Sequence, residues 1–149
     1  TILHPTDFSP TSEHALKVAA SLARDYGARL IILHVAPAPV VVYGDGIVPP
    51  DPTQHRATAH RLLEEIRPLE GALPVERRLV EGDAVWEILR MAVELPCDAI
   101  VMGTHGRTAL GRLLMGSVAE QVLRKAPCMV LTVKTPPQAE LVPAALCVG

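Results

Sequence analysis

The stretch from Asp98 to Glu120 constrains the fold of this chain most, because it joins a strand, a glycine-rich loop and a helix start in that order. The strand is the apolar run DAIVM, and the loop after it contains four glycines, Gly103, Gly106, Gly111 and Gly116. A helix N-terminus presents free N–H groups and a positive dipole end that attract phosphate, and glycine lets the backbone approach an anion. Ser117 and Glu120 have the spacing of a capping box, which predicts a helix that begins at Ser117. A phosphate is therefore expected at Gly116 and Ser117.

The length and charge of the chain exclude several classes of protein. Its 149 residues are 49% hydrophobic, which suits one domain with a sizeable core. A net charge of −2 argues against nucleic-acid binding, which normally needs a clustered basic face. No apolar run approaches the roughly 20 residues of a membrane span, and the N-terminus shows no signal-peptide pattern. We therefore expect a cytoplasmic protein that binds neither nucleic acid nor membrane.

The cysteines and histidines indicate no metal site. Cys97 and Cys128 lie beside or within apolar segments and lack CxxC spacing, which predicts buried, inert thiols. Cys147 lies in the C-terminal tail, where it could be exposed. The six histidines form no HExxH or paired-ligand spacing, so we expect no metal site made by the protein.

Strand and helix signals alternate along the whole chain. Ser9 before Pro10 predicts a helix N-cap, and Asp83 predicts a second one. Pro68 is expected to disturb the end of the second helix. Strands are predicted at residues 1–4, 28–35, 74–80, 98–102 and 128–133, and helices at residues 10–27, 53–70, 83–95 and 117–125.

This order predicts the fold class. It is α/β, a single-domain open parallel five-stranded sheet with helices on both faces, Rossmann-like, with strand order 3-2-1-4-5. The alternating residues 74–80 suit a strand near the sheet edge. Trp86, with Val85, Leu89 and Val93, forms an apolar stripe on the third helix, so we expect its indole in the core.

The irregular segment from Ala36 to Thr53 is too long for a routine connection, and it follows the C-terminal end of a strand. In a parallel sheet that end lies on the ligand side, so the segment could be a lid over a bound molecule. A surface crossover without a role in binding is the alternative, and the sequence leaves both open.

The last strand, Cys128 to Val133, leaves one hydrogen-bonding edge free at the end of the sheet. A free edge is an aggregation hazard unless something covers it. Pairing with the same strand of a second copy would cover it, so we expect a homodimer. The tail from Thr135 to Gly149 packs on the partner or is disordered; its role stays open.

A second loop is equipped for the ligand edge of the sheet. Pro5, Thr6 and Asp7 follow the first strand, and ligands of open parallel sheets bind beyond the carboxyl ends of the strands. An ionised Asp7 can accept hydrogen bonds from sugar hydroxyls. The alternative is that Asp7 only helps to cap the first helix.

The spacing Gly103-x2-Gly106-x9-Gly116-Ser117 is neither a Walker P-loop nor the GxGxxG of dinucleotide folds. Together with PTDFS after the first strand, it closely resembles the ATP-binding branch of the universal stress protein family. The resemblance runs from Ile2 to about Val133, so we expect a nucleotide-binding domain at residues 1–134 and a separate tail at residues 135–149.

The resemblance implies a role for each matching residue. Asp7 would hold the ribose or border the adenine, and Val35 with Met102 would line the adenine slot. Phosphate would be bound by Gly116, Ser117 and Val118. The complete set of expected nucleotide-binding residues is Pro5, Thr6, Asp7, Val35, Met102, Gly103, Gly106, Arg107, Gly116, Ser117 and Val118. Of these, Arg107 rests on charge and position and not on the resemblance, as do the further candidates His105 and Arg112. The two arginines could equally be solvated loop charges.

The function expected from this resemblance is an ATP-binding, dimeric stress-response or signalling module. Magnesium would accompany ATP, held mostly by phosphate oxygens and water. The glycine loop contains no lysine and no metal-binding aspartate of the kind used for phosphoryl transfer, so any catalysis should be slow. A slow ATPase or nucleotidyl transferase, and a dimerisation scaffold without nucleotide, remain as alternatives.

Overall fold

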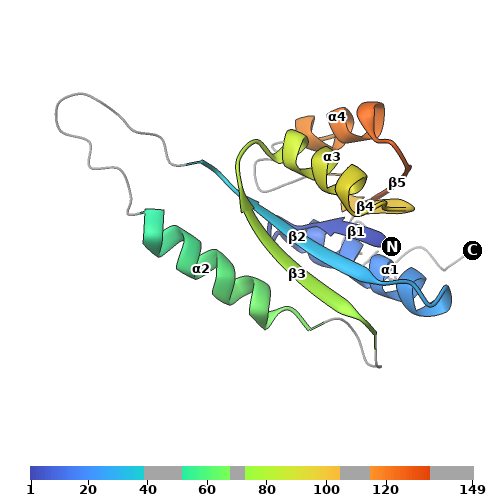
Figure 1. Ribbon diagram of the computed structural model, residues 1–149, viewed down its shortest axis with the longest axis horizontal. Coiled ribbons are helices and arrows are strands. Elements are labelled where there is room, and N and C mark those ends of the chain that lie inside the picture. Colours follow the sequence, from blue (N-terminus) through green and yellow to red (C-terminus); the bar gives the residue numbers. More distant parts are fainter. Residues whose placement is uncertain (39–51, 68–72, 105–114, 135–149) are drawn as a thin grey trace, which may run out of the picture.

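The computed structural model describes residues 1–38, 52–67, 73–104 and 115–134. Strands and helices alternate along this part of the chain (Figure 1). Their bounds are β1 Ile2–Pro5, α1 Pro10–Asp25, β2 Leu30–Ala36, α2 Pro52–Glu65, β3 Val75–Glu81, α3 Ala84–Glu94, β4 Ala99–Gly103, α4 Ser117–Lys125 and β5 Met129–Val133. Within these ranges, no helix has the length and apolar character that crossing a bilayer requires.

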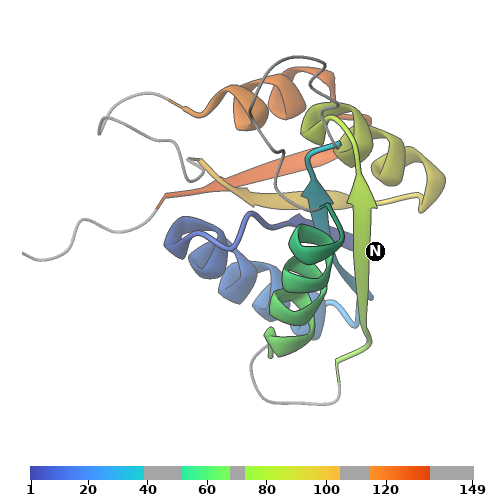
Figure 2. The ribbon, with the colours of Figure 1, turned by 90° about the vertical axis from the view of Figure 1, so that its left-hand side faces the viewer.

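The strands form one parallel sheet in the order β3-β2-β1-β4-β5, which confirms the predicted fold class and strand order. β1 is central, with Ile2 opposite Leu30 of β2 on one side and Ala99 of β4 on the other. Helices α1 and α2 cover one face of the sheet, and α3 and α4 cover the other (Figure 2). β3 lies at an edge, as predicted.

Each face of the sheet has its own hydrophobic core. Leu3, Ile31 and Ile100 pack under α3 and α4, whereas Leu30 and Ile32 pack under α1 and α2. All five side chains are fully buried. Because successive side chains of a strand point to opposite faces, a strand covered on both sides needs a continuous apolar run. This explains the runs from which the strands were predicted.

The helix starts at Ser9 and Asp83 are confirmed. Ser9 is the N-cap of α1, and its Oγ accepts a hydrogen bond from the N–H of Ser12 at 3.2 Å. Asp83 is the N-cap of α3, and its Oδ1 accepts from the N–H of Trp86 at 2.8 Å. The chain then leaves α1 through Gly27, whose φ of +60° suits glycine.

The predicted end of the second helix is wrong. α2 ends at Glu65, several residues before Glu70, and residues 68–72 lie outside the described part of the chain. Arg77 of β3 contacts this end of the helix, because its guanidinium donates to the carbonyl oxygens of Leu63 at 3.1 Å and Ile66 at 2.8 Å. A cation on the last carbonyls of a helix terminates it favourably.

The prediction that Trp86 lies in the core is also wrong. Its side chain is 61% exposed, and the guanidinium of Arg90 lies 5.5 Å from the ring centre. The buried stripe of α3 consists of Val85, Ile88, Met91 and Ala92. Trp86, Leu89 and Val93 repeat at helical spacing too, so α3 has two apolar stripes and periodicity alone did not identify the inner one.

The structure confirms the predicted burial of Cys97 but not that of Cys128. Cys97 is buried, and burial raises the pKa of its thiol to about 11. Cys128 is half-buried, and burial raises its pKa as well. The thiolate is the reactive form, and a raised pKa lowers its population at neutral pH. Cys147 lies outside the described residues.

His4 is a buried polar side chain on the central strand. Its side chain is inaccessible to solvent, and its Nδ1 lies 2.8 Å from the carbonyl oxygen of Val101. Since a carbonyl only accepts, Nδ1 carries the proton. Nε2 is buried with no hydrogen-bond partner among the described residues. Burial lowers the pKa of His4 from 6.5 to about 4, while the bond to Val101 and the charge of Asp7 oppose that shift.

We expect His4 to make the fold sensitive to acid. Between pH 6.5 and 4, the unfolded chain binds a proton that the folded chain excludes, so stability falls as the pH falls. His4→Asn keeps a donor for Val101 and does not titrate. Between pH 7 and pH 4.5, the free energy of unfolding of the wild type should fall by about 2 to 3 kcal/mol more than that of His4→Asn. Urea denaturation at each pH measures both values. Parallel pH profiles would contradict this assignment.

Candidate functional site

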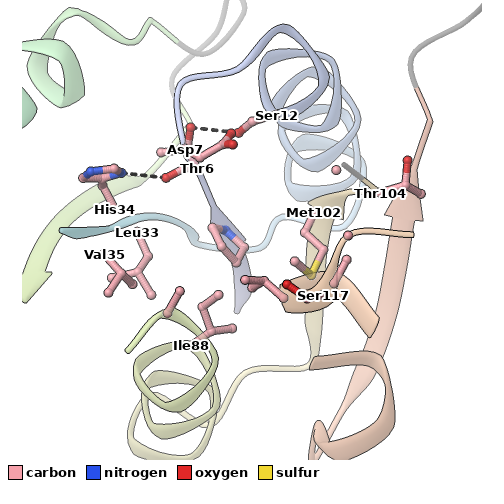
Figure 3. Close-up of a pocket in the computed structure, with 16 residues that line it drawn as sticks. Thr6, Asp7, Ser12, Leu33, His34, Val35, Ile88, Met102, Thr104 and Ser117 are labelled. Atoms are coloured by element: carbon pink, nitrogen blue, oxygen red, sulfur yellow. Dashed lines mark hydrogen bonds between the residues drawn. The ribbon is translucent and has the colours of Figure 1, made fainter. Parts of the chain in front are cut away.

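A cleft of about 180 Å³ lies beyond the carboxyl ends of β1, β2 and β4 (Figure 3). The starts of α3 and α4 complete its walls. β1 has β2 on one side and β4 on the other, so this is the point where strand order reverses. The lining residues are Pro5, Thr6, Asp7, Ser12, Leu33, His34, Val35, Ala84, Ile88, Met102, Gly103, Thr104, Gly116, Ser117, Val118 and Ala119.

Nine of the eleven residues predicted to bind nucleotide line this one cleft. They are Pro5, Thr6, Asp7, Val35, Met102, Gly103, Gly116, Ser117 and Val118. The other two, Gly106 and Arg107, lie outside the described residues, as do His105 and Arg112. Most of the loop from Ala36 to Thr53 is also outside them, so the choice between a lid and a surface crossover stays open.

Several lining residues were not predicted: Ser12, Leu33, His34, Ala84, Ile88, Thr104 and Ala119. Ala84 and Ile88 come from the first two turns of α3, whose start lies at the same edge of the sheet as that of α4. The sequence could have placed these two residues near the cleft, since every helix that follows a parallel strand begins at that edge of the sheet. His34 gave no such signal, because strand alternation places it on the face opposite Val35.

The loop after β1 is held together by hydroxyl groups. The Oγ1 of Thr6 accepts hydrogen bonds from the N–H of Phe8 at 3.1 Å and from the hydroxyl of Ser12 at 2.8 Å. The Oδ1 of Asp7 accepts from the N–H of Ser9 at 3.1 Å and from its hydroxyl at 2.6 Å. Asp7 therefore supports the N-cap of α1, which was one of its two expected roles. A carboxylate has about four lone-pair sites, so this contact does not exclude the other.

Helix α4 begins at Ser117 as predicted, but the predicted capping box is wrong. Gly116 is the N-cap, and its carbonyl oxygen accepts from the N–H of Glu120 at 3.0 Å. Ser117 is thus already the first helical residue, and no side chain in the described part of the chain caps this helix. Ser117 and Val118 line the cleft, and among the described residues their N–H groups have no side-chain acceptor, the arrangement that suits an anion.

Gly103 lines the cleft, and close packing against α1 accounts for a glycine at this position. A Cβ at this position would lie 2.9 Å from the Cγ2 of Thr11 and 3.3 Å from its carbonyl carbon. These atoms belong to the first turn of α1, which crosses the end of β4. The glycine therefore lets α1 approach the sheet, a role that spacing alone did not distinguish from ligand contact.

Gly103→Ala should lower the free energy of unfolding by about 1 to 3 kcal/mol, the usual cost of overpacking. Thr11→Ser removes the closest atom, Cγ2, so Gly103→Ala should cost less in that background. Urea denaturation of the four combinations measures the coupling between the two sites, expected at about 0.5 kcal/mol or more. Additive effects would show that this close contact is not what requires glycine.

The cleft combines an apolar slot with a polar wall. Leu33, Val35, Ile88 and Met102 provide the slot. Thr6, Asp7, Ser12, Thr104 and Ser117 provide hydroxyl or carboxylate groups, and Asp7 and His34 are its titratable lining residues. In the described ranges, no group of His, Cys, Asp and Glu could hold a metal ion. These walls suit a flat ring joined to a hydroxylated and anionic part.

Known proteins resemble this chain in sequence and in structure. A sequence model described as the universal stress protein family matches residues 1–134. The chain is 35% identical over 135 residues to a universal stress protein of Thermus aquaticus, covering 90% of this chain and 98% of that protein. The structure resembles universal stress protein UspA from Lactobacillus plantarum, with a TM-score of 0.71, 25% identity, and coverage of 89% of this chain and 95% of that one. It also resembles a universal stress protein solved in complex with cAMP, with a TM-score of 0.67, 26% identity, and coverage of 91% and 96%.

Proposed function

Because this chain belongs to the universal stress protein family, we propose that its cleft binds an adenine nucleotide, ATP with magnesium, in a stress-response or signalling module. One observation carries the proposal: the loop after β1 and the start of α4, which no described side chain caps, line the same cleft. The solved relative in complex with cAMP supports an adenine nucleotide as the ligand class.

Each wall of the cleft suits one part of the nucleotide. The N–H groups of Ser117 and Val118, with the Ser117 hydroxyl, suit phosphate. The carboxylate of Asp7 suits a ribose hydroxyl. Val35 and Met102 offer an apolar surface to the base. Magnesium would be held by phosphate oxygens and water, as is usual for this ion with nucleotides.

The cleft favours binding over catalysis. Among its described lining residues there is one carboxylate, that of Asp7, and no lysine. Phosphoryl transfer uses a placed lysine, a metal-binding aspartate and a residue that orients the nucleophile. We therefore propose a nucleotide holder, with ATP hydrolysis at most slow, whose nucleotide state alters its shape or its choice of partner.

Gly116→Val tests the phosphate end of the cleft. A branched side chain at the N-cap would occupy the approach to the first-turn N–H groups, so the affinity for Mg–ATP, measured by isothermal titration calorimetry, should fall about tenfold or more. Gln121→Val puts the same side chain at an exposed position of α4 and should bind as the wild type does.

Equal affinities in both variants would show that the loop is structural only. Absence of any bound or titratable adenine nucleotide in the wild type, with magnesium present, would overturn the proposed function itself.

We further propose that the protein is a homodimer that pairs through the last strand, Cys128 to Val133. β5 lies at the edge of the sheet, where Met129 is 66% and Leu131 is 37% exposed. An uncovered apolar edge strand is hazardous for a monomer, and pairing with a second copy would remove the hazard.

Leu131→Lys should therefore shift the protein from dimer to monomer in light scattering coupled to size-exclusion chromatography, because a charge on an edge strand opposes pairing. Leu123→Lys makes the same change on the exposed side of α4, where the side chain is 47% exposed, and should leave the dimer intact. A monomeric wild type, or a dimer that survives Leu131→Lys, would refute pairing through β5.

A further inference from the structure

His34 lies where the backbone pairing of β1 and β2 ends. The last ladder bond at the cleft end runs from the N–H of Thr6 to the carbonyl oxygen of Leu33, at 2.8 Å. Beyond this bond the segment that follows β1 leaves the sheet. The carbonyl oxygen of Thr6 lies 2.7 Å from the Nδ1 of His34, and since a carbonyl only accepts, Nδ1–H is the donor. Figure 3 shows this bond between the His34 side chain and Thr6. It continues the connection between the two segments beyond the last ladder bond.

The same imidazole contacts the loop again two residues later. The ring centres of His34 and Phe8 lie 4.3 Å apart, with an interplanar angle of 35°. Phe8 has a φ of +62°, the only positive value of a non-glycine residue in the described part of the chain. Such a backbone conformation persists only when surrounding contacts impose it, and it is common at binding sites. His34 supplies one of those contacts.

These two contacts enclose Asp7. His34 holds the carbonyl group before Asp7 and the aromatic ring after it. On the other side, Ser9 bonds the carboxylate of Asp7, and Ser12 bonds Thr6. The loop is thus fixed from α1 by serine hydroxyls and from β2 by one imidazole.

We propose that His34 is a positioning residue for the nucleoside end of the ligand, acting through Thr6 and Phe8. This inference rests on the proposed nucleotide-binding function. If His34 served packing alone, replacing it would lower the stability of the fold and would weaken the binding of every ligand of the cleft equally. Positioning acts on the loop after β1 and leaves the phosphate site at α4, on the far side of the cleft, unchanged.

Two substitutions separate the hydrogen bond from the ring. His34→Leu keeps an apolar side chain and removes the donor. His34→Asn loses the ring but keeps an N–H at about the reach of Nδ1. His14→Leu, on α1 and outside the cleft lining, is the matched control. NMR monitors titrations of each variant with three ligands: Mg–ATP, adenosine and tripolyphosphate. Tripolyphosphate has only the phosphates in common with ATP.

We expect His34→Leu to weaken adenosine and Mg–ATP binding about three- to tenfold, the effect of one lost hydrogen bond, and to leave tripolyphosphate binding as in the wild type. His34→Asn should recover most of the loss, and His14→Leu should show none. If His34→Leu does not fold, Phe8→Asn tests the second contact, since asparagine tolerates positive φ. It should weaken adenosine binding and spare tripolyphosphate.

Unchanged adenosine affinity in His34→Leu, or in Phe8→Asn where that variant replaces it, would overturn the inference. So would His34→Asn binding as weakly as His34→Leu, or an equal loss for tripolyphosphate. A wild type that binds neither adenosine nor Mg–ATP would instead overturn the proposed function. The two failures are therefore distinguishable.

Discussion

The pairing of β1 with β2 on one side and β4 on the other determines where every part of the candidate site lies. All strands run parallel, so their carboxyl ends and the helix starts that follow them meet at one edge of the sheet. β1 ends between its two neighbours, and its loop faces the start of α4 across the cleft. The buried apolar runs on both faces of the sheet hold this pairing in place.

Much of this arrangement could be predicted from local signals. Continuous apolar runs identified the strands, and Ser9 and Asp83 identified two helix starts, because N-capping depends on few residues. Once the sheet was known to be parallel, the loops after the first and fourth strands had to share an edge. Asp7 and Ser117 could therefore be assigned to one site from the sequence alone, and both line the cleft.

The errors arose where two local patterns competed. α3 has two apolar stripes, and only tertiary packing selects Ile88 over Trp86 for the interior. At α4, Gly116 and Ser117 could each have been the N-cap, and a capping box favoured the residue with a side chain. In the structure the glycine takes that place, and no side chain within the described ranges caps the first turn at the cleft. His34 could not be predicted, since its contacts depend on where the loop after β1 turns.

The central claim is that the start of α4 and the loop after β1 bind one nucleotide together. An NMR titration of the isotopically labelled wild-type protein with Mg–ATP tests it directly. We predict that the amide signals of Ser117 and Val118 shift together with those of Thr6 and Asp7, and that all four saturate with the same dissociation constant. Saturable shifts confined to the opposite edge of the sheet, around Cys97 and Cys128, or no shift at all, would contradict it.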